Sequence, residues 1–265
     1  MTHPQAAYLK TTLYCDYDHP DVIRQARVVT ASLSSDRDKA VAIFYWVRDK
    51  ILYRVGHWQK RASETLYERE GTCTNAANIF VAMCRAVGIP SGYGVLRVKG
   101  KKYFGPVMLP VFRHFIRDES VHIYGVVFLE GRWVRVDPSD DYAFCRATCH
   151  FNPTGQLVDW DGQSDALLHL DPADILASFW PEADIETWMK KSPKNGMGTT
   201  ALLGNTYVKF LRSNRESVAS CEELQPLFVK HLLKERFYLY LCWQYLRGLI
   251  FFRRIRRDSM TLFDA

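Results

Sequence analysis

Cys73 occupies a position where the sequence predicts the start of a buried helix. The apolar residues of segment 72–87 recur at helical spacing, and the segment ends at Gly88-Ile89-Pro90, a pattern that stops helices. A helix start presents unpaired N–H groups and the positive end of the helix dipole, and both lower the pKa of a thiol. Because the thiolate is the nucleophilic form of cysteine, this position favours a reactive Cys73. Taken alone, the pattern is equally typical of a small core residue, which is the role we expect for Cys84 on the same helix.

A β-hairpin is predicted further along the chain. Segments 121–129 and 132–137 alternate apolar and polar residues, and they flank the dipeptide Glu130-Gly131. If this dipeptide forms a two-residue loop, Leu129 pairs with Arg132, and every other cross-strand pair follows from that one.

This register places His122 and Asp137 on one face of the hairpin. It sets Tyr124 opposite Asp137, and side chains alternate with a period of two, so His122, Tyr124, Trp133 and Asp137 project together. His122 and Asp137 are then diagonal neighbours with roughly 7–8 Å between their backbone positions, a gap that an imidazole and a carboxylate can bridge. A three-residue loop without a bulge would place them on opposite faces.

Together, Cys73, His122 and Asp137 are the residue types that transfer acyl groups. The cysteine would attack an acyl carbon, the histidine would move the proton, and the aspartate would orient the ring and stabilise the imidazolium. The oxyanion formed by the attack needs hydrogen-bond donors. The backbone N–H of Cys73 is the first candidate, and the choice of a second is open between Tyr67 and Trp58.

The composition predicts a folded globular protein. The chain has 265 residues, of which 48% are hydrophobic and 14% aromatic, and this suffices for a packed core. The chain begins without a charged and apolar leader, and its seven cysteines include no CxxC pair. We therefore expect a cytoplasmic protein without a disulfide framework. The longest apolar stretch, residues 237–252, is interrupted by Gln244 and Arg247 and is too short for a membrane span.

The positive charge of the chain belongs to its C-terminal part. The net charge is +6, yet segment 230–257 alone holds eight basic residues against one acidic residue. Such a run is usually a solvated helix end, and it could instead meet an acidic protein partner. The densest part, residues 253–257, lacks interleaved aromatics and any recognised nucleic-acid-binding module, so we expect no nucleic-acid ligand.

The other patterns predict a mixture of helices and strands. We expect helices from about residue 21 and over 36–51, a helical turn within 54–72, a strand over 93–98, a loop over 99–120, short helices near 172–179 and 182–190, and helical structure from 199 to about 257.

We also make specific predictions for several residues other than Cys73, His122 and Asp137. We expect the basic loop with Lys99, Lys101, Lys102 and Arg113 to cover the mouth of the site, and we expect Asp140 and Asp141 to be solvated turn residues. A compact cluster is formed by Cys145, Cys149 and His150. Three adjacent ligands with no second cluster make tetrahedral closure awkward, so we expect no metal and no cofactor.

The motifs resemble those of the transglutaminase-like cysteine superfamily. The residues that carry the resemblance are Gly71-Thr72-Cys73, Ala86-Val87-Gly88-Ile89-Pro90, His122, Gly131-Arg132-Trp133-Val134 and Asp137-Pro138. The resemblance implies an α+β, papain-like fold in which the Cys73 helix packs on an antiparallel sheet that carries His122 and Asp137. It also implies that Cys73, His122 and Asp137 are catalytic.

Further segments resemble one bacterial branch of this superfamily, which includes the transglutaminase-like condensing enzyme of andrimid biosynthesis. They are Asp16-Tyr17-Asp18-His19-Pro20, Arg61-Ala62-Ser63-Glu64, Trp160-Asp161-Gly162 and residues 165–169. That enzyme joins an acyl group on one carrier protein to an amine on another. The chain departs from the branch at Thr74-Asn75, where members often have Val-Pro, and it keeps Asp137 where many members have threonine.

The resemblance covers about residues 8–180, so we expect a catalytic domain over 1–198 and a helical, basic extension over 199–265. Our leading hypothesis is amide bond formation through a Cys73 thioester in natural-product biosynthesis. The acyl group would come from an acyl or peptidyl carrier protein and would pass to an amine acceptor. The alternatives are a cysteine peptidase or amidase of the same fold, and a non-catalytic binding module.

Overall fold

A computed structural model describes residues 5–105, 113, 116–148, 158–168, 171–190, 198–214 and 221–234. A four-stranded antiparallel sheet in the order β5-β4-β3-β6 forms its centre. The strands are β3 (Ser91–Lys99), β4 (Glu119–Leu129), β5 (Arg132–Val136) and β6 (Ile175–Glu182). A second sheet consists of two short parallel strands, β1 (Leu52–Tyr53) and β2 (Glu70–Gly71).

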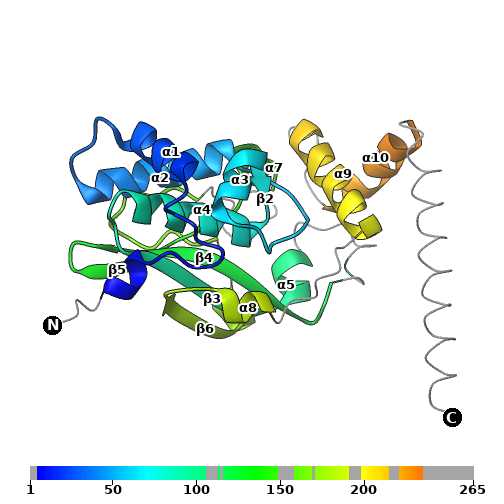
Figure 1. Ribbon diagram of the computed structural model, residues 1–265. Coiled ribbons are helices and arrows are strands. Elements are labelled where there is room, and N and C mark those ends of the chain that lie inside the picture. Colours follow the sequence, from blue (N-terminus) through cyan, green and yellow to red (C-terminus); the bar gives the residue numbers. More distant parts are fainter. Residues whose placement is uncertain are drawn as a thin grey trace, which may run out of the picture.

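Helices gather on one side of the larger sheet and at one of its ends (Figure 1). Those on the side are α1 (Pro20–Thr30), α2 (Asp36–Lys50), α3 (Ala62–Glu68) and α4 (Cys73–Ala86). The others are α5 (Gly100–Phe104), α7 (Tyr142–Thr148), α8 (Glu186–Lys190), α9 (Gly198–Asn214) and α10 (Cys221–Lys234), with short 3₁₀ turns η1 (Ala6–Leu9) and η4 (Pro172–Asp174). The α+β class expected from the sequence is confirmed.

The central helix α4 is buried along almost its whole length. All residues from Thr74 to Arg85 are buried, as expected for a helix covered by α1, α2 and α3 on one side and the sheet on the other. The helix ends at Ala86 with Val87 as its C-cap, and Gly88 follows with φ of +83°, a left-handed conformation that glycine adopts without strain. Cys84 is fully buried in this core, as expected.

The body of α4 packs on only one of the two faces of the large sheet. Apolar side chains of that face share a core with the helix, and they include Ile123, Val127, Val134 and Val136. Gly125 marks the closest approach, because a Cβ atom there would lie 2.6 Å from a ring carbon of Phe80. The opposite face has a smaller core of its own, formed by Leu96, Val98, Tyr124 and Val126 with Trp133 packed against it.

The predicted hairpin register is confirmed. Strands β4 and β5 pair Leu129 with Arg132 and continue in step to Gly125 opposite Val136. The loop residues Glu130 and Gly131 have φ values of +51° and +84°, and two successive positive φ angles are typical of a type I′ turn. This turn matches the right-handed twist of the strands, which is why the two-residue loop fixes the register.

The expected helix over residues 172–179 is wrong. Only η4 is helical there, and Ile175–Glu182 forms β6, which pairs antiparallel with the edge of β3. Tertiary pairing therefore overrides the local pattern, as is common for short edge strands. The expected helix near 182–190 is shortened to α8 for the same reason, because β6 occupies the chain up to Glu182.

The C-terminal part of the described chain is helical, as expected. Helices α9 and α10 bury Tyr207, Phe210 and Phe228 in a cluster that also includes Phe144 of α7. The basic residues from 235 to 257 lie outside the described residues, and the boundary between domains at residue 198 stays a prediction. Within the described ranges, no helix is both long and apolar enough to cross a membrane.

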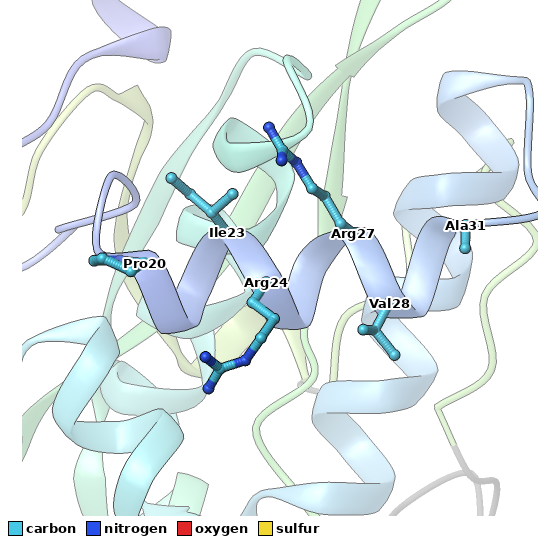
Figure 2. A pocket seen from close by; sticks show the side chains of 6 residues that line it. All are labelled: Pro20, Ile23, Arg24, Arg27, Val28 and Ala31. Carbon is cyan, nitrogen blue, oxygen red and sulfur yellow. The ribbon is translucent and has the colours of Figure 1, made fainter.

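An open hollow lies over the outer face of α1 (Figure 2). Its lining comes from that helix alone and consists of Pro20, Ile23, Arg24, Arg27, Val28 and Ala31. None of the residues that we singled out for chemistry lines it.

Arg85 of α4 joins three separate segments of the fold. Its guanidinium is buried and donates to the carbonyl oxygens of Ser91 at 2.8 Å, of Ala183 at 2.7 Å and of Lys10. These bonds tie α4 to the start of β3, to the N-terminal segment and to the chain after β6.

We predict that Arg85→Met lowers the free energy of unfolding by about 3 kcal/mol or more. Hydrogen bonds from a charged donor contribute about 1.5–3 kcal/mol each, and methionine would leave three carbonyls without this partner. Chemical denaturation would measure the change. Arg97→Met is the matched control, because Arg97 is 45% exposed and pairs with Glu119 at the surface, where an ion pair contributes about 0–1 kcal/mol. Equal midpoints for both variants would contradict the role of Arg85.

Candidate active site

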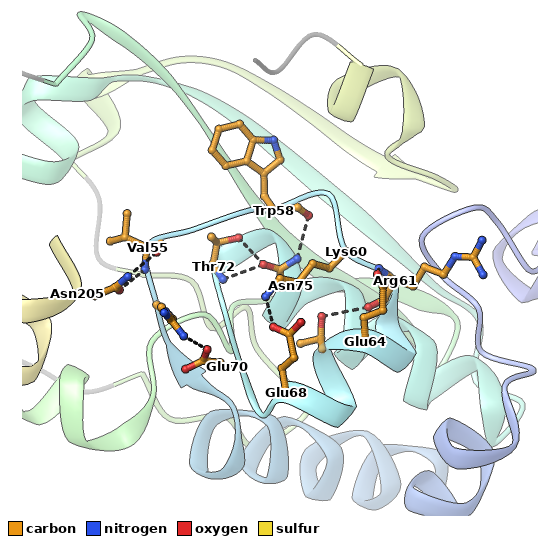
Figure 3. Close-up of polar contacts among 12 residues, drawn as sticks. Val55, Trp58, Lys60, Arg61, Glu64, Glu68, Glu70, Thr72, Asn75 and Asn205 are labelled. Carbon is orange, nitrogen blue, oxygen red and sulfur yellow. Dashed lines mark hydrogen bonds and ion pairs between the residues drawn. The ribbon is translucent and has the colours of Figure 1, made fainter. Parts of the chain in front are cut away.

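The N-terminus of α4 is fixed by the side chain of Asn75. Asn75 Oδ1 accepts the backbone N–H of Thr72 at 2.9 Å and the Thr72 hydroxyl at 3.0 Å (Figure 3). Asn75 Nδ2 donates to the carbonyl oxygen of Trp58 at 2.9 Å. Because Asn75 is fully buried, it holds the first turn of the helix around Cys73 and ties that turn to the segment of Trp58.

His122 and Asp137 meet as the hairpin register predicts. His122 Nε2 lies 2.6 Å from Asp137 Oδ2, and each residue is 2% exposed. The other carboxylate oxygen, Oδ1, accepts the backbone N–H of Ser139 at 3.1 Å and also the Ser139 hydroxyl. Both oxygens of the carboxylate are therefore occupied, which fixes the plane of the imidazole.

The thiol of Cys73 lies against the same imidazole. His122 Nε2 faces Asp137, so Nδ1 is the ring nitrogen left for the hydrogen bond with Cys73. Burial alone would raise the pKa of Cys73, but the charge of His122 and its hydrogen bond outweigh this, with help from the backbone N–H of Ile123, and the pKa falls below its ordinary value.

The His122 pKa moves in the opposite direction. Burial would lower the pKa of the ring, but the charges of Asp137 and Cys73 and their hydrogen bonds raise it well above the ordinary value. The two shifts share a cause, since each ion stabilises the other, and Asp137 raises the pKa of His122 in addition. The arrangement stabilises the thiolate of Cys73 and the imidazolium of His122 together.

Cys73 reaches His122 around the edge of β4. The body of α4 covers the opposite face of the sheet, so the approach is possible only where β5 has ended. On the outer side of the hairpin, the N–H of Asp137 bonds the carbonyl oxygen of Ala166 at 2.8 Å. Continuing the hairpin register would set Pro138 opposite Ile123, but β5 stops at Val136. This leaves the N–H of Ile123 for the Cys73 sulfur.

The Ile123 donor was not anticipated from the sequence. The signal that could have found it is Pro138, because proline commonly ends a ladder of strand hydrogen bonds, and a strand that ends there leaves the edge of β4 at Ile123 without its partner. A strand edge left open next to His122 is the place where another chain segment can bind.

The structure distinguishes between the two candidates for the second oxyanion donor, Tyr67 and Trp58. Tyr67 is 90% exposed on α3, so its side chain extends into solvent, and that candidate is dropped. Trp58 Nε1 is buried and has no hydrogen-bond partner among the described residues, although a buried N–H group normally has one. With its carbonyl held by Asn75, Trp58 lies next to the turn that carries Cys73.

Aromatic side chains enclose the pair of Cys73 and His122. The ring of Tyr103 on α5 lies 5.2 Å from the His122 ring, between centroids. Burial raises the phenol pKa of Tyr103 and of Tyr53, and a negative charge on Cys73 raises both further. Tyr53 belongs to β1, so residues from two distant segments lie near Cys73.

Segment 99–120 is not the continuous loop that we expected, because residues 100–104 form α5 and β4 begins at Glu119. It approaches the site through an aromatic residue rather than through its lysines. Lys99 Nζ bonds the carbonyl oxygen of Ala173 at 2.8 Å, and Lys101 pairs with Asp118 at 2.6 Å. Residues 106–112 and 114–115 lie outside the described residues. The described part of the loop contributes Tyr103.

The expectation that Asp141 is solvated is wrong. Asp141 is 2% exposed, accepts the N–H of Phe144 at the start of α7 and the N–H of Tyr53, and forms an ion pair with Arg212. Its neighbour Asp140 is half-buried near the site. Burial first, and then the charge of Asp137, raise the pKa of Asp140 to about 7.

The cysteine cluster near residue 145 is only partly described. Cys145 is buried in α7, and Cys149 and His150 lie outside the described residues. Among the residues that are described, no three His, Cys, Asp or Glu side chains are placed to hold a metal ion.

Comparison with known proteins agrees with the geometry of the site. Residues 23–138 match the family model of the transglutaminase-like superfamily, and this range includes Cys73, His122 and Asp137. None of the curated proteins compared with the chain matches it.

Two solved structures are similar in part. A candidate cysteine protease from Cytophaga hutchinsonii is 22% identical with a TM-score of 0.39, and the alignment covers 49% of this chain and 40% of that one. A candidate protease from Parabacteroides distasonis is 14% identical with a TM-score of 0.35, covering 51% of this chain and 26% of that one. The chain thus spans less than half the length of either protein.

We predict that iodoacetamide alkylates Cys73 with an apparent pKa below the ordinary thiol value of 9.0. In His122→Ala the apparent pKa should rise above that value, because burial remains after the imidazolium is lost, and the rate at pH 7 should fall at least about tenfold. Mass spectrometry of the alkylated peptide would follow the rate. Cys84→Ala is the control and should leave the profile unchanged, since burial raises the pKa of Cys84 well above the ordinary value. An unshifted profile in His122→Ala would contradict the ion pair.

We predict that Asp140→Asn stabilises the fold above pH 7. The folded-state pKa of about 7 exceeds the ordinary 3.8, so the folded protein loses stability as pH rises between these values, and asparagine escapes this loss. The gain at pH 8 should be up to about 4 kcal/mol and should vanish below about pH 4. Denaturation at several pH values would measure it, with Asp118→Asn at the exposed surface as the control. A gain that does not depend on pH would contradict the assignment.

Proposed function

We propose that this protein transfers an acyl group through a thioester on Cys73 and releases it as an amide. The observation that carries the proposal is the thiol held against His122, whose ring is fixed in turn by the buried Asp137. Nucleophile, base and orienting carboxylate are the groups that covalent acyl transfer requires. The match of residues 23–138 to the transglutaminase-like superfamily supports the same reaction class.

The first half of the reaction loads the enzyme. The Cys73 thiolate attacks the carbonyl carbon of the donor thioester, and the tetrahedral intermediate collapses with cleavage of the bond to the donor sulfur. His122, as imidazolium, gives its proton to the departing thiol. The acyl group is then bound to Cys73, and His122 is neutral with Asp137 still holding Nε2.

The second half releases the product. An amine attacks the acyl carbon, and neutral His122 removes one proton from the nitrogen. The new amide forms as Cys73 leaves as a thiolate, and the thiolate–imidazolium pair is restored. No oxidant, reductant or cofactor enters this balance.

Each tetrahedral intermediate carries a negative oxygen that needs donors. The backbone N–H of Cys73 at the start of α4 is one, strengthened by the helix dipole. We assign the second to Trp58, because its buried Nε1–H has no partner in the described part of the chain and its backbone is tied to the same helix turn by Asn75. An N–H group in this position stabilises the intermediate without first giving up another hydrogen bond.

Transfer to an amine rather than to water is favoured by the surroundings of Cys73. The half-buried side chains of Tyr53 and Tyr103 lie near the sulfur, and shielding a thioester from water protects it from hydrolysis. A carrier protein as donor follows from the resemblance to the bacterial condensing branch. Carrier proteins are acidic, and the basic segment from residue 230, of which α10 holds the exposed Lys230, has the complementary charge.

We predict that an acyl thioester on a carrier protein acylates Cys73 and that an added amine converts the adduct to a free amide. Intact mass would show the adduct, and chromatography would show the product. Cys73→Ala should abolish the adduct, and Asp137→Asn should slow its formation by about three to four orders of magnitude, since the histidine loses its orienting anion. Cys84→Ala on the same helix is the matched control and should acylate normally.

Other outcomes would point to a different function. Acylation by peptides or simple amides, followed by hydrolysis with no effect of amines, would make the protein a peptidase or amidase. Full activity in Cys73→Ala would exclude the proposed nucleophile. Binding of a carrier protein with no adduct under any condition would identify a non-catalytic module.

A further inference from the structure

Helix α9 forms hydrogen bonds with the backbone of the chain segment that leads from β1 to Trp58. Asn205 Oδ1 accepts the N–H of Val55 at 2.9 Å, and Asn205 Nδ2 donates to the carbonyl oxygen of the same residue at 2.8 Å (Figure 3). One amide side chain thus satisfies both polar backbone groups of Val55. Gly204 allows the close approach, because a Cβ atom there would lie 3.2 Å from the Val55 side chain.

Arg212 holds the same segment two residues earlier. It lies two helical turns after Asn205, so both side chains leave α9 on one face. Arg212 Nη2 donates to the carbonyl oxygen of Tyr53 at 2.8 Å and also pairs with Asp141, which accepts the N–H of Tyr53 at 2.8 Å. The backbone of Tyr53 is therefore clamped from both sides, and its ring stacks on Phe144 with centroids 4.9 Å apart.

The clamped segment borders the reacting sulfur in two ways. Its first residue, Tyr53, pairs with Gly71, and the N–H of Arg54 bonds the Gly71 carbonyl at 2.7 Å, just two residues before Cys73. Its far end continues to Trp58, whose Nε1–H we assign to the oxyanion. Together with the bond from Asn75 to Trp58, the position of this segment therefore helps to place the Trp58 donor relative to the Cys73 sulfur.

We propose that Asn205 and Arg212 are positioning residues for the oxyanion donor and the wall of the acyl site. The proposal rests on the proposed acyl transfer. Both residues lie beyond the range 23–138 that matches the transglutaminase-like superfamily. The C-terminal helices are in this view part of the catalytic apparatus of this chain, although they supply no reacting group.

Two reactions of Cys73 separate this role from a purely structural one. Alkylation by iodoacetamide needs the thiolate but no oxyanion donor, because the negative charge leaves on iodide. Acylation by an activated ester such as a p-nitrophenyl acyl ester needs both the thiolate and the donor. A misplaced Trp58 slows acylation only, whereas a general loss of structure changes both rates.

For Asn205→Ala we expect acylation to slow by about 10- to 100-fold, with alkylation of Cys73 within about twofold of wild type. Arg212→Lys keeps the positive charge next to Asp141 but loses the paired donors of the guanidinium group. Its acylation should also slow while its alkylation stays near wild type, with a smaller difference between the two rates. Ser213→Ala and Lys209→Ala on the same helix are the matched controls and should leave both rates unchanged. Ser213 bonds only within α9, and the Lys209 side chain is exposed.

A double variant tests whether the effect passes through the tryptophan. If Asn205 acts by placing Trp58, the acylation rate of Trp58→Phe/Asn205→Ala should be no lower than that of Trp58→Phe alone. Three results would overturn the proposal. The losses could be additive in the double variant, or acylation and alkylation could fall equally in Asn205→Ala. The third result is unchanged acylation in both Asn205→Ala and Arg212→Lys. Failure of wild-type protein to acylate, with normal alkylation, would instead refute the proposed function, and this inference would fall with it.

Discussion

The buried contact between His122 and Asp137 constrains the rest of this structure. A carboxylate and an imidazole that are each 2% exposed need compensation for their lost hydration, and here they supply it to one another at 2.6 Å. The contact requires the two residues to lie on one face of the hairpin, and the two-residue turn at Glu130-Gly131 achieves this. A slip of one residue would send one of them into the core packed against α4.

The position of Cys73 follows from that constraint. Because His122 faces away from the body of α4, the cysteine can reach it only past an open strand edge, and Pro138 together with the early departure of β5 provides one. The same edge offers the N–H of Ile123 to the sulfur. The ion pair therefore depends on the open strand edge at the end of β5 as well as on the start of α4. Asn75 connects the start of α4 to Trp58.

The parts that could be predicted from the sequence are those set by local pattern. Helical spacing and Gly88 marked the ends of α4, and the two-residue loop determined the hairpin register, so the meeting of His122 with Asp137 followed from counting. The missed features depend on partners that are distant in sequence. Asp141 is buried because Arg212 lies 71 residues later, Val55 is held from a position 150 residues away, and residues 175–182 form a strand because the edge of β3 is open to them. No local pattern encodes such contacts.

The central claim is that His122 is an imidazolium because Cys73 is a thiolate, and NMR titration of the His122 ring measures this most directly. The account predicts that in wild-type protein the ring stays protonated well above its ordinary pKa of 6.5, and that Cys73→Ala lowers this pKa because the neighbouring anion is gone. A ring that titrates at or below 6.5 in wild-type protein, or one that titrates identically with and without the Cys73 sulfur, would contradict the account.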